Sequence, residues 1–563
     1  MLRRNKGTDN ATRILLHYES ETETMTGERL LLSGDDAVAL GALHAGVRLG
    51  TGYPGTPSTE ILETFDRIGG RAQWSPNEKV ALEVACGSAF AGARTIVTMK
   101  HVGLNVAADA LFTATHTDVD GGLVIVSADD PGMASSQNEQ DNRHYGRAAA
   151  APVLEPIDSQ QAYDFTWLGL ELSERWKIPV ILRLTTRVCH AKTVVRPRAP
   201  HQDDSALRFR RDVPARVMIP AFAKPAHRRL RQKLAEITAW NEAEGPIEEH
   251  RGNRELGIVA TGVAAVHARE AAPDACQLTI GLTYPLPLER IRAFAASVDR
   301  LVVIEEGDPV LVDSLRAAGI DAEGKPEQYR FGELNVARVR RILARDTSPE
   351  SEPPAGKPPE LCPGCSHRAV FETLRDLDCI VSGDIGCYTL GVLPPFSAMD
   401  TCVCMGASVG VGLGLRHVLP EDEARRVVSV IGDSTFVHSG LTGIAEMVYN
   451  PPATGHVVLI LDNATTAMTG QQEHPGTGRL LDHSPTKRIS FESVCESMGV
   501  DNVHVLDLHR NADGLRPLLE ELLARDETSV VITRQPCVLA APKIRLYEKA
   551  AAEQAECAAA TQD

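Results

Sequence analysis

The sequence predicts an α/β protein with two large parallel-sheet lobes and a smaller α/β domain between them. Short apolar runs such as TIVTM and LVIVSA alternate with stretches of helical periodicity, a pattern typical of strands that are buried on both faces. Aromatic residues make up only 4% of the chain, whereas Ala and Gly are plentiful, which suits closely packed helices and sheets. The segment DTSPESEPPAGKPPE is rich in Pro, Ser and Glu, so it indicates a linker between lobes.

Size and charge limit the classes of function. The 563 residues are enough for three or four domains. The net charge of −17 predicts an acidic surface that repels nucleic acid and anionic membranes, so neither is expected as a partner. No apolar window is long enough to span a membrane, and the N-terminal segment lacks the apolar core of a secretory signal. We therefore expect a cytoplasmic protein.

The first lobe and the smaller domain follow one another along the chain. Residues 1–27 are predicted to be a polar tail, and residues 28–196 the first lobe, with ALGALHAGVRLG as a helix and VILRLTTRV as a strand. Residues 197–254 are predicted to be a connecting arm with one charged helix, HRRLRQKLAEITAWNEAEG. Residues 255–346 are predicted to be the smaller domain, because LGIVATG, QLTIGL and RLVVIEEG read as strands.

The linker covers residues 347–360 and leads into the second lobe, residues 361–545. Its clearest strands are VVSVIGDS and HVVLILDN. The last residues, 546–563, form an Ala-rich tail that we expect to be a frayed helix or disordered.

The ends of those two strands carry the strongest motif. Asp433 and Asn463 stand 30 residues apart, each directly after a buried strand, and open α/β sheets bind ligands at such ends. These side-chain oxygens and the carbonyl of Thr465 suit Mg²⁺, which shares its shell with phosphate oxygens. Four glycines are expected to let the backbone approach the phosphates: Gly432, Gly440, Gly443 and Gly470.

This motif resembles the thiamine-diphosphate motif of diphosphate-binding domains, with Ser434 where many members have Gly. The resemblance implies thiamine diphosphate and Mg²⁺ as cofactors, with Asp433, Asn463 and Thr465 as the metal ligands. The implied cofactor-binding residues are Gly432, Asp433, Ser434, Asn463, Thr465, Met468 and Gly406.

The first lobe resembles the pyrimidine-binding domain of the same enzymes. In NEKVALEVACGSAF, the family pattern of a Glu nine residues ahead of Gly implies Glu78 as the carboxyl that meets the aminopyrimidine; this role requires a desolvated, protonatable acid. Glu83 is the competing acid on another helix face, and both could be solvated instead. TGYPGTPSTE resembles the family turn that implies Thr56 at the substrate carboxylate, although a simple turn would also explain it.

Segments in the family order extend over residues 28–540, so the chain is identified as similar to the large (alpha) subunits of indolepyruvate:ferredoxin oxidoreductases, in the 2-oxoacid:ferredoxin oxidoreductase superfamily. The resemblance implies two thiamine-diphosphate-binding-fold lobes with a transketolase-C-terminal-like domain between them. It also implies oxidative decarboxylation of an aryl 2-oxoacid, such as indolepyruvate or phenylpyruvate, to an acyl-CoA. Electrons would pass to ferredoxin or another low-potential acceptor. A smaller beta subunit is expected as a partner.

Cysteines suggest where electrons could leave. Half of the 12 cysteines lie between residues 362 and 404. The ferredoxin-like domain usual in the family does not follow RQPCVLAAPK, so we expect an exit through a partner or a further electron-transfer subunit. Four cysteines resemble the ligands of a proximal [4Fe–4S] cluster: Cys362, Cys365, Cys387 and Cys537. A structural Zn²⁺ site or inert thiols are alternatives, and Cys402 and Cys404 are spare candidates.

Three histidines lie in motif loops: His101, His438 and His474. We assign His101 and His438 to the catalytic set, to position the substrate carboxylate or move a proton, although each could be structural. Two rival functions remain open at this point: a non-oxidative thiamine-diphosphate decarboxylase or carboligase, and a non-catalytic scaffold subunit.

Overall fold

The computed structural model describes residues 29–201, 206–351 and 358–560, so the predicted polar tail at residues 1–27 lies outside the described residues. The chain divides into two compact units, Met1–Glu350 and Ser351–Asp563, and the division falls inside the predicted linker. Across the described ranges, helices long and apolar enough to cross a membrane are absent.

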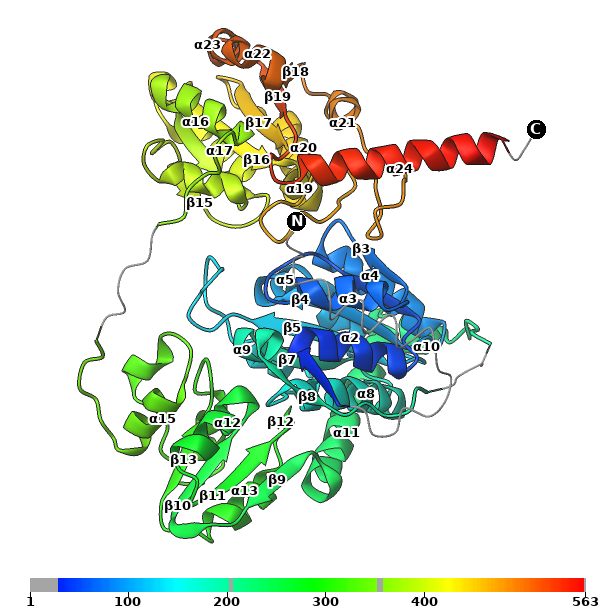
Figure 1. Ribbon diagram of the computed structural model, residues 1–563, viewed down its shortest axis with the longest axis vertical. Coiled ribbons are helices and arrows are strands. Elements are labelled where there is room, and N and C mark those ends of the chain that lie inside the picture. The colour runs from blue at the N-terminus through cyan, green and yellow to red at the C-terminus, as the bar shows by residue number, and fades with distance from the viewer. Residues whose placement is uncertain (1–28, 202–205, 352–357, 561–563) are drawn as a thin grey trace, which may run out of the picture. The chain divides into compact units, whose positions relative to one another are not determined.

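The first unit contains the first lobe, a seven-stranded sheet of order β12-β6-β7-β5-β4-β2-β3 (Figure 1). Its neighbours are parallel except for the antiparallel pair β12–β6. The strands are β2 (Leu49–Gly52), β3 (Ala72–Trp74), β4 (Thr95–Lys100), β5 (Leu123–Asp129), β6 (Val153–Leu154), β7 (Val180–Thr185) and β12 (Leu282–Tyr284). The helices are α2 (Gly34–His44), α3 (Thr59–Arg67), α4 (Glu78–Phe90), α5 (His101–Val106), α6 (Ala108–Ala114), α7 (Arg143–Ala149), α8 (Ser159–Trp176) and α9 (Thr186–His190).

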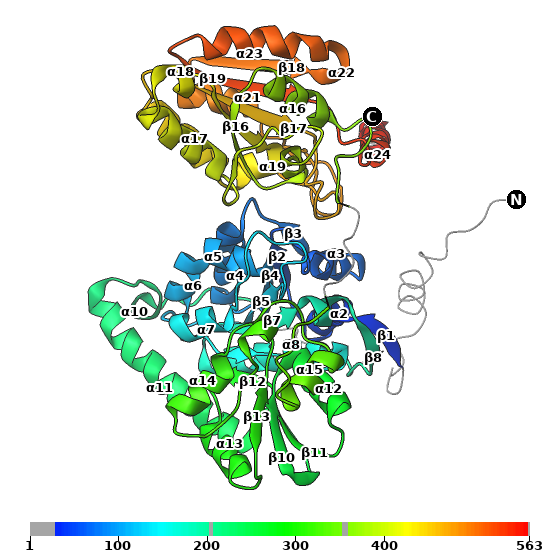
Figure 2. The same ribbon diagram turned by 90° about the vertical axis from the view of Figure 1, so that its left-hand side faces the viewer.

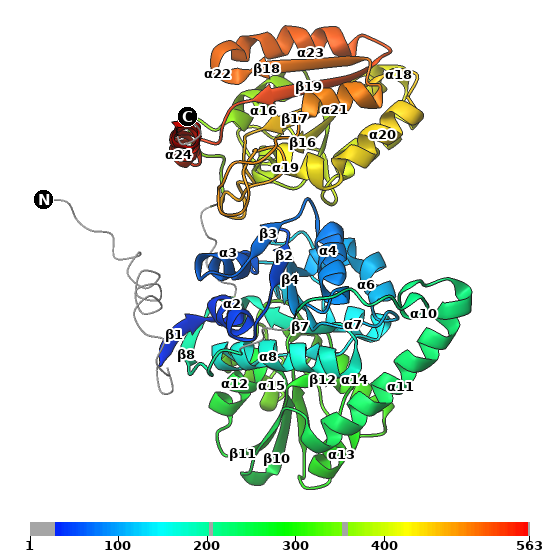
Figure 3. The same cartoon turned by 90° about the vertical axis from the view of Figure 1, so that its right-hand side faces the viewer.

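The predicted strands TIVTM and LVIVSA are confirmed as β4 and β5, and every residue of both is buried. Two predicted elements end earlier in the structure than the sequence indicated. VILRLTTRV is a strand only to Thr185, after which α9 begins. ALGALHAGVRLG is helical only to His44, because Gly46 takes a positive φ of 75° that ends the helix before β2. A two-stranded antiparallel ribbon, β1 (Leu30–Ser33) with β8 (Lys192–Val195), lies at the edge of this lobe (Figure 3).

The smaller domain is a four-stranded sheet of order β13-β10-β11-β9. Its strands are β9 (Ile247–His250), β10 (Asn253–Ala260), β11 (Ala275–Ile280) and β13 (Leu301–Ile304), and its helices are α12 (Gly262–Ala271), α13 (Leu288–Ala295), α14 (Val310–Ala317), η1 (Glu327–Arg330) and α15 (Val336–Leu343). The sheet therefore begins inside the predicted arm. The rest of the arm contains α10 (Val213–Arg216) and the charged helix as α11 (Pro220–Glu244), which runs along the side of the unit (Figure 2). Trp240 of α11 packs edge-on against Trp176 of the lobe.

A buried network of charges joins the lobe to the smaller domain. Arg143 donates to Glu305 at 2.6 Å and to Asp141, and Arg183 donates to Glu155 at 2.9 Å. All five side chains are at most 3% exposed. Because burial of a charge is costly unless it is paired, these contacts depend on one another.

Replacing Arg143 by Met should lower the free energy of unfolding of the first unit by about 3–5 kcal/mol, because it leaves buried carboxylates without their cation. Denaturant titration of the full chain measures the change. The matched control is Arg316→Met, which removes an exposed pair with Asp313 and should change the free energy by less than about 1 kcal/mol. Equal effects for the two variants would mean that the network adds no net stability.

The second unit contains the second lobe, a wholly parallel six-stranded sheet of order β15-β14-β16-β17-β19-β18. The strands are β14 (Ile380–Gly383), β15 (Thr401–Cys402), β16 (Val427–Gly432), β17 (His456–Asp462), β18 (Asn502–Asp507) and β19 (Thr528–Arg534). The helices are α16 (Ser366–Asp376), η2 (Cys387–Val392), α17 (Ala407–Val418), α18 (Glu421–Ala424), α19 (Asp433–Thr435), the π-helical η3 (Phe436–Gly440), α20 (Leu441–Tyr449), α21 (Phe491–Met498), α22 (Leu508–Asn511), η4 (Ala512–Gly514), α23 (Leu515–Leu523) and α24 (Ala541–Ala560).

Alternate residues of β17 fill two separate cores, as the two-residue period of a strand requires. Leu459 and Leu461 face the core formed with α16 and α23. Val458 and Ile460 face the core formed with α17, α20 and α21. The sheet is thus covered on both faces, and its strand ends are left for the site. The predicted α/β class, with a smaller α/β domain between two parallel-sheet lobes, is confirmed.

Candidate functional site

Asp433 and Asn463 lie side by side at one edge of the second sheet. Asp433 opens the helical run after β16, and Asn463 directly follows β17, the parallel neighbour of β16. The Asp433 Oδ2 atom accepts hydrogen bonds from the Asn463 N–H at 3.1 Å and the Ala464 N–H at 2.8 Å, and Oδ1 accepts one from the Ser434 N–H at 2.9 Å. The predicted pair is therefore brought together by direct contact.

The loop after Asn463 is fixed to this edge. The Thr465 N–H donates to Asn463 Oδ1 at 3.1 Å, and Thr466 Oγ1 donates to Ser434 Oγ at 2.8 Å. Ala464 turns the chain with a positive φ of 61°. Met468 lies further along this loop and is exposed. Asn463 and Thr465 are buried, so the oxygen donors predicted for a metal are held in a preorganised place.

The charge of this edge fits a cation. Asp433 is 2% exposed, and within the described ranges no Lys or Arg forms an ion pair with it. His474 Nε2 lies 3.2 Å from Asp433 Oδ2. His367, which the sequence reasoning missed, lies with its Nε2 3.5 Å from Asn463 Nδ2, and burial lowers its pKa to about 4. The neighbouring His367 ring is thus neutral at pH 7, so it adds no positive charge that would repel a hard cation at the oxygens.

Three of the predicted site glycines have packing or conformational roles that do not depend on phosphates. A side chain at Gly440 would collide with Ile431 of β16, and one at Gly443 with Val409 of α17, so Gly440 allows close packing on the sheet and Gly443 allows α20 to approach α17. Gly406 has a φ of 86°, and its N–H donates to Asp384 Oδ1 at 2.9 Å. Asp384 was also missed by the sequence reasoning, although GDIGC contains it. It fixes the start of α17 by accepting the Ser408 N–H as well, at 3.0 Å.

The four predicted cysteines line one cavity: Cys362, Cys365, Cys387 and Cys537. They come from the loop before α16, from the start of η2 and from the turn after β19. His367 and Asn463 line the same cavity, so it adjoins the Asp433 edge. The spare candidates Cys402 and Cys404 are exposed and lie outside this lining.

The four thiols lie near one another in this cavity. Burial raises the pKa of Cys387 to about 11, and the charges of Cys365, Cys537 and Cys362 add to the rise because they are close. Yet over the described residues, no three cysteine sulfurs lie within 4.8 Å of one another. Tetrahedral Zn²⁺ with bonds of about 2.3 Å needs sulfurs about 3.8 Å apart. Among the described residues, the cysteines are therefore not arranged as a preformed Zn²⁺ site.

In the first unit, the structure separates the two candidate acids. Glu78 is the first residue of α4 and is 4% exposed, and its carboxyl lies against Gly103, where any side chain would collide with it. Glu83 is exposed and pairs with Lys79 on the same helix. Only Glu78 therefore has the desolvated setting that the proton chemistry needs.

The remaining predicted residues are positioned as follows. His101 is fully buried, with Nε2 3.1 Å from the Asn138 carbonyl oxygen, and burial lowers its pKa. Thr56 is half-buried in the loop before α3. His438 is buried in the π-helical segment, a distortion often found at functional sites, with Nδ1 2.7 Å from Ser439 Oγ.

Comparison with known proteins agrees with both halves. Residues 40–244 match the family model "Pyruvate flavodoxin/ferredoxin oxidoreductase, thiamine diP-bdg", and residues 384–533 match "Thiamine pyrophosphate enzyme, C-terminal TPP binding domain". Indolepyruvate oxidoreductase subunit IorA of Archaeoglobus fulgidus is 38% identical over 93% of this chain and 88% of that protein. The same subunit of Methanothermobacter thermautotrophicus is 38% identical over 94% and 90%.

Among solved structures, a 2-oxoglutarate:ferredoxin oxidoreductase from Magnetococcus marinus aligns with a TM-score of 0.48 and 18% identity, over 56% of this chain and 65% of that chain. The full-length sequence relatives are decisive, and they confirm the resemblance drawn from the motifs. The chain belongs to the IorA family of indolepyruvate oxidoreductase subunits, enzymes that use thiamine diphosphate to oxidise 2-oxoacids.

Proposed function

We propose that this chain is the catalytic subunit of an enzyme that oxidatively decarboxylates an aryl 2-oxoacid, such as indolepyruvate, to an acyl-CoA. Electrons pass to ferredoxin or another low-potential acceptor, and a smaller beta subunit completes the enzyme. The observation that carries the proposal is the position of Asn463, which bonds to Asp433 and also lines the four-cysteine cavity. A non-oxidative decarboxylase would not need a thiol-lined cavity beside its cofactor.

Thiamine diphosphate, when bound, supplies the electron sink that lets a 2-oxoacid lose CO₂. Asp433, Asn463 and the carbonyl of Thr465 would hold Mg²⁺ with the diphosphate, since they offer buried hard oxygens at one strand edge. The contacts at Asn463 and Ala464 would keep the Asp433 carboxylate oriented.

Three residues of the first unit would handle the substrate and protons. Glu78 would exchange a proton with the aminopyrimidine ring, because its carboxyl is buried and held in place against Gly103. Thr56 would donate to the substrate carboxylate. His101, neutral because it is buried, would accept or donate one hydrogen bond without adding charge.

The second unit would supply further groups. His438 would position the substrate or move a proton. The four cavity cysteines would hold a [4Fe–4S] cluster, which needs four thiolates. Met468, on the loop after Asn463, would contact the cofactor.

The test uses the full chain purified anaerobically with its beta subunit, given thiamine diphosphate, Mg²⁺, CoA, indolepyruvate and a viologen dye. We expect dye reduction together with one acyl-CoA per two electrons, and slower reaction with pyruvate than with indolepyruvate. Aldehyde release without dye reduction would instead establish the non-oxidative reaction. Failure to bind thiamine diphosphate would establish a scaffold subunit.

Replacing Asp433 by Asn should weaken binding of thiamine diphosphate with Mg²⁺ by roughly 10- to 100-fold, since a charged ligand worth about 1.5–3 kcal/mol is lost while the shape is kept. Calorimetric titration measures the affinity. Asp422→Asn, an exposed acid of the same unit, is the control and should bind normally. Unchanged affinity in the Asp433 variant would place the metal elsewhere.

A further inference from the structure

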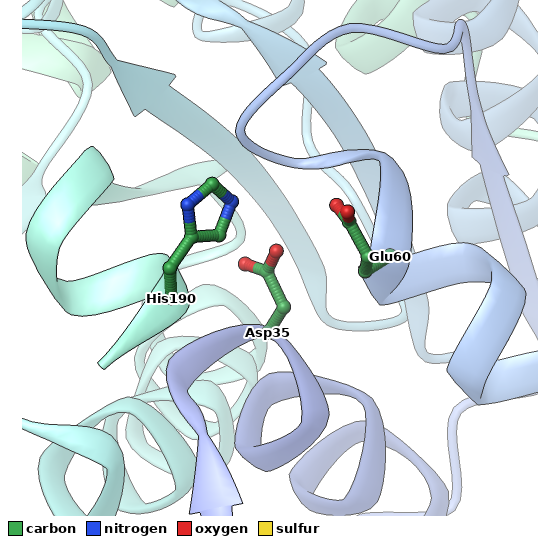
Figure 4. Close-up of side chains that lie close together, drawn as sticks. All are labelled: Asp35, Glu60 and His190. Carbon is green, nitrogen blue, oxygen red and sulfur yellow. The ribbon is translucent and has the colours of Figure 1, made fainter. Parts of the chain in front are cut away.

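Three side chains that no part of the proposed function uses converge in the first unit. Asp35 lies in the first turn of α2, Glu60 in the first turn of α3, and His190 ends α9. Figure 4 shows the Asp35 carboxylate pointing between the His190 ring and the Glu60 carboxylate. One ligand atom from each lies within 4.8 Å of the other two. The group therefore has the size of a single-ion site.

Asp35 gives this cluster a second, independent feature. It is 1% exposed, and in the described structure neither of its carboxylate oxygens has a nitrogen or oxygen hydrogen-bond partner. The cap of α2 does not use it, because Ser33 Oγ bonds to Asp36 instead. A buried, unsatisfied carboxylate costs several kcal/mol as an order of magnitude, so this carboxylate requires either a proton or a cation.

The geometry of the three side chains suits the cation. Neighbouring Cys189, whose thiol pKa is raised by burial so that it keeps its proton, can donate only a weak hydrogen bond to Asp35. A divalent ion would remove the repulsion between the two carboxylates and satisfy both oxygens of Asp35.

We propose that Asp35, Glu60 and His190 form a binding site for one divalent first-row transition ion. Two carboxylate oxygens with one imidazole nitrogen are a typical ligand set for Mn²⁺, Fe²⁺ or Zn²⁺. Glu60 and His190 are exposed, so water can complete the shell and the ion can enter from solvent.

The site has a structural consequence for the first lobe. It ties the starts of α2 and α3 to the end of α9. Gly34 already packs so closely on the backbone of Val188 that no side chain would fit there. Because α3 directly follows the loop that carries Thr56, the ion would hold that loop in place.

The test is titration of the full chain with Mn²⁺, followed by electron paramagnetic resonance of the free ion. Mn²⁺ is chosen because it prefers oxygen and nitrogen ligands over the thiolates of the second unit. The chain used carries Asp433→Asn, and no thiamine diphosphate is added, so the metal site proposed at Asp433 does not contribute to Mn²⁺ binding. We expect one bound Mn²⁺ per chain and a higher melting temperature of the first unit.

Glu60→Gln and His190→Asn should each weaken Mn²⁺ binding at least tenfold, and both should fold because the two residues are exposed. Glu171→Gln, an exposed acid on α8, is the matched control and should bind as the parent does. Absence of bound Mn²⁺, or equal binding in all variants, would overturn the proposal and leave Asp35 as a protonated buried acid. Neither result depends on the reaction of the enzyme, so this test and the activity test can fail separately.

Discussion

Replacing Glu78 by Gln should lower the turnover number of 2-oxoacid oxidation by about 10²–10⁴-fold, the usual contribution of a positioned acid or base. Gln keeps the shape of the side chain and its place against Gly103, but it cannot exchange a proton. The cofactor should still bind within a few-fold of normal, because the residues that we propose for its diphosphate are unchanged. Dye reduction with indolepyruvate measures turnover, and calorimetry measures cofactor affinity.

Glu83→Gln separates this role from a general effect of removing an acid from α4. Glu83 is exposed and only pairs with Lys79, so its loss should leave turnover within about twofold, as expected for a surface pair. If Glu83→Gln were the inactive variant and Glu78→Gln the active one, the assignment within this helix would be reversed. A loss of folding in Glu78→Gln would show in its melting temperature, and Glu78→Asp, which keeps the acid, should then restore part of the turnover.

The pairing of Asp433 with Asn463 could be predicted from sequence because each residue stands at the end of a recognisable strand. Asp433 and Asn463 each directly follow an apolar strand, and consecutive parallel strands place such ends together. The four cysteines were predicted to gather only through resemblance to a family, since Cys362 and Cys537 are too far apart for any spacing rule. Here the structure supplied what the sequence could not, a common cavity.

Other features had no signal in the sequence. Arg143 bonds to Glu305, 162 residues further on, and no periodicity predicts a contact of that range. Asp35 looked like an ordinary acid in the first turn of a helix, which is its favoured place. Only the fold shows that it is buried and faces Glu60 and His190. Long-range burial of charge is therefore what sequence reasoning missed.

Replacing Cys365 by Ser should remove the iron–sulfur centre that we propose for the four-cysteine cavity. The anaerobically purified chain should contain about four irons and four acid-labile sulfides, with a visible band that bleaches with dithionite. The variant should contain almost none, because a serine hydroxyl does not replace a thiolate at such a centre. Electron transfer to the dye should fall to background while thiamine diphosphate still binds, since Asp433 and Asn463 are unchanged.

Cys379→Ser is the control for this change. Cys379 is also half-buried in the second unit and packs against the same core, but it lies outside the cavity lining. It should keep its iron, sulfide and electron transfer. A parent chain that holds one zinc and no sulfide would contradict the cluster. A parent chain without metal, kept from air throughout, would assign the electron path to the partner subunit. The cavity thiols would then serve only to pack the wall behind Asn463, and Cys365→Ser would change stability but leave turnover alone.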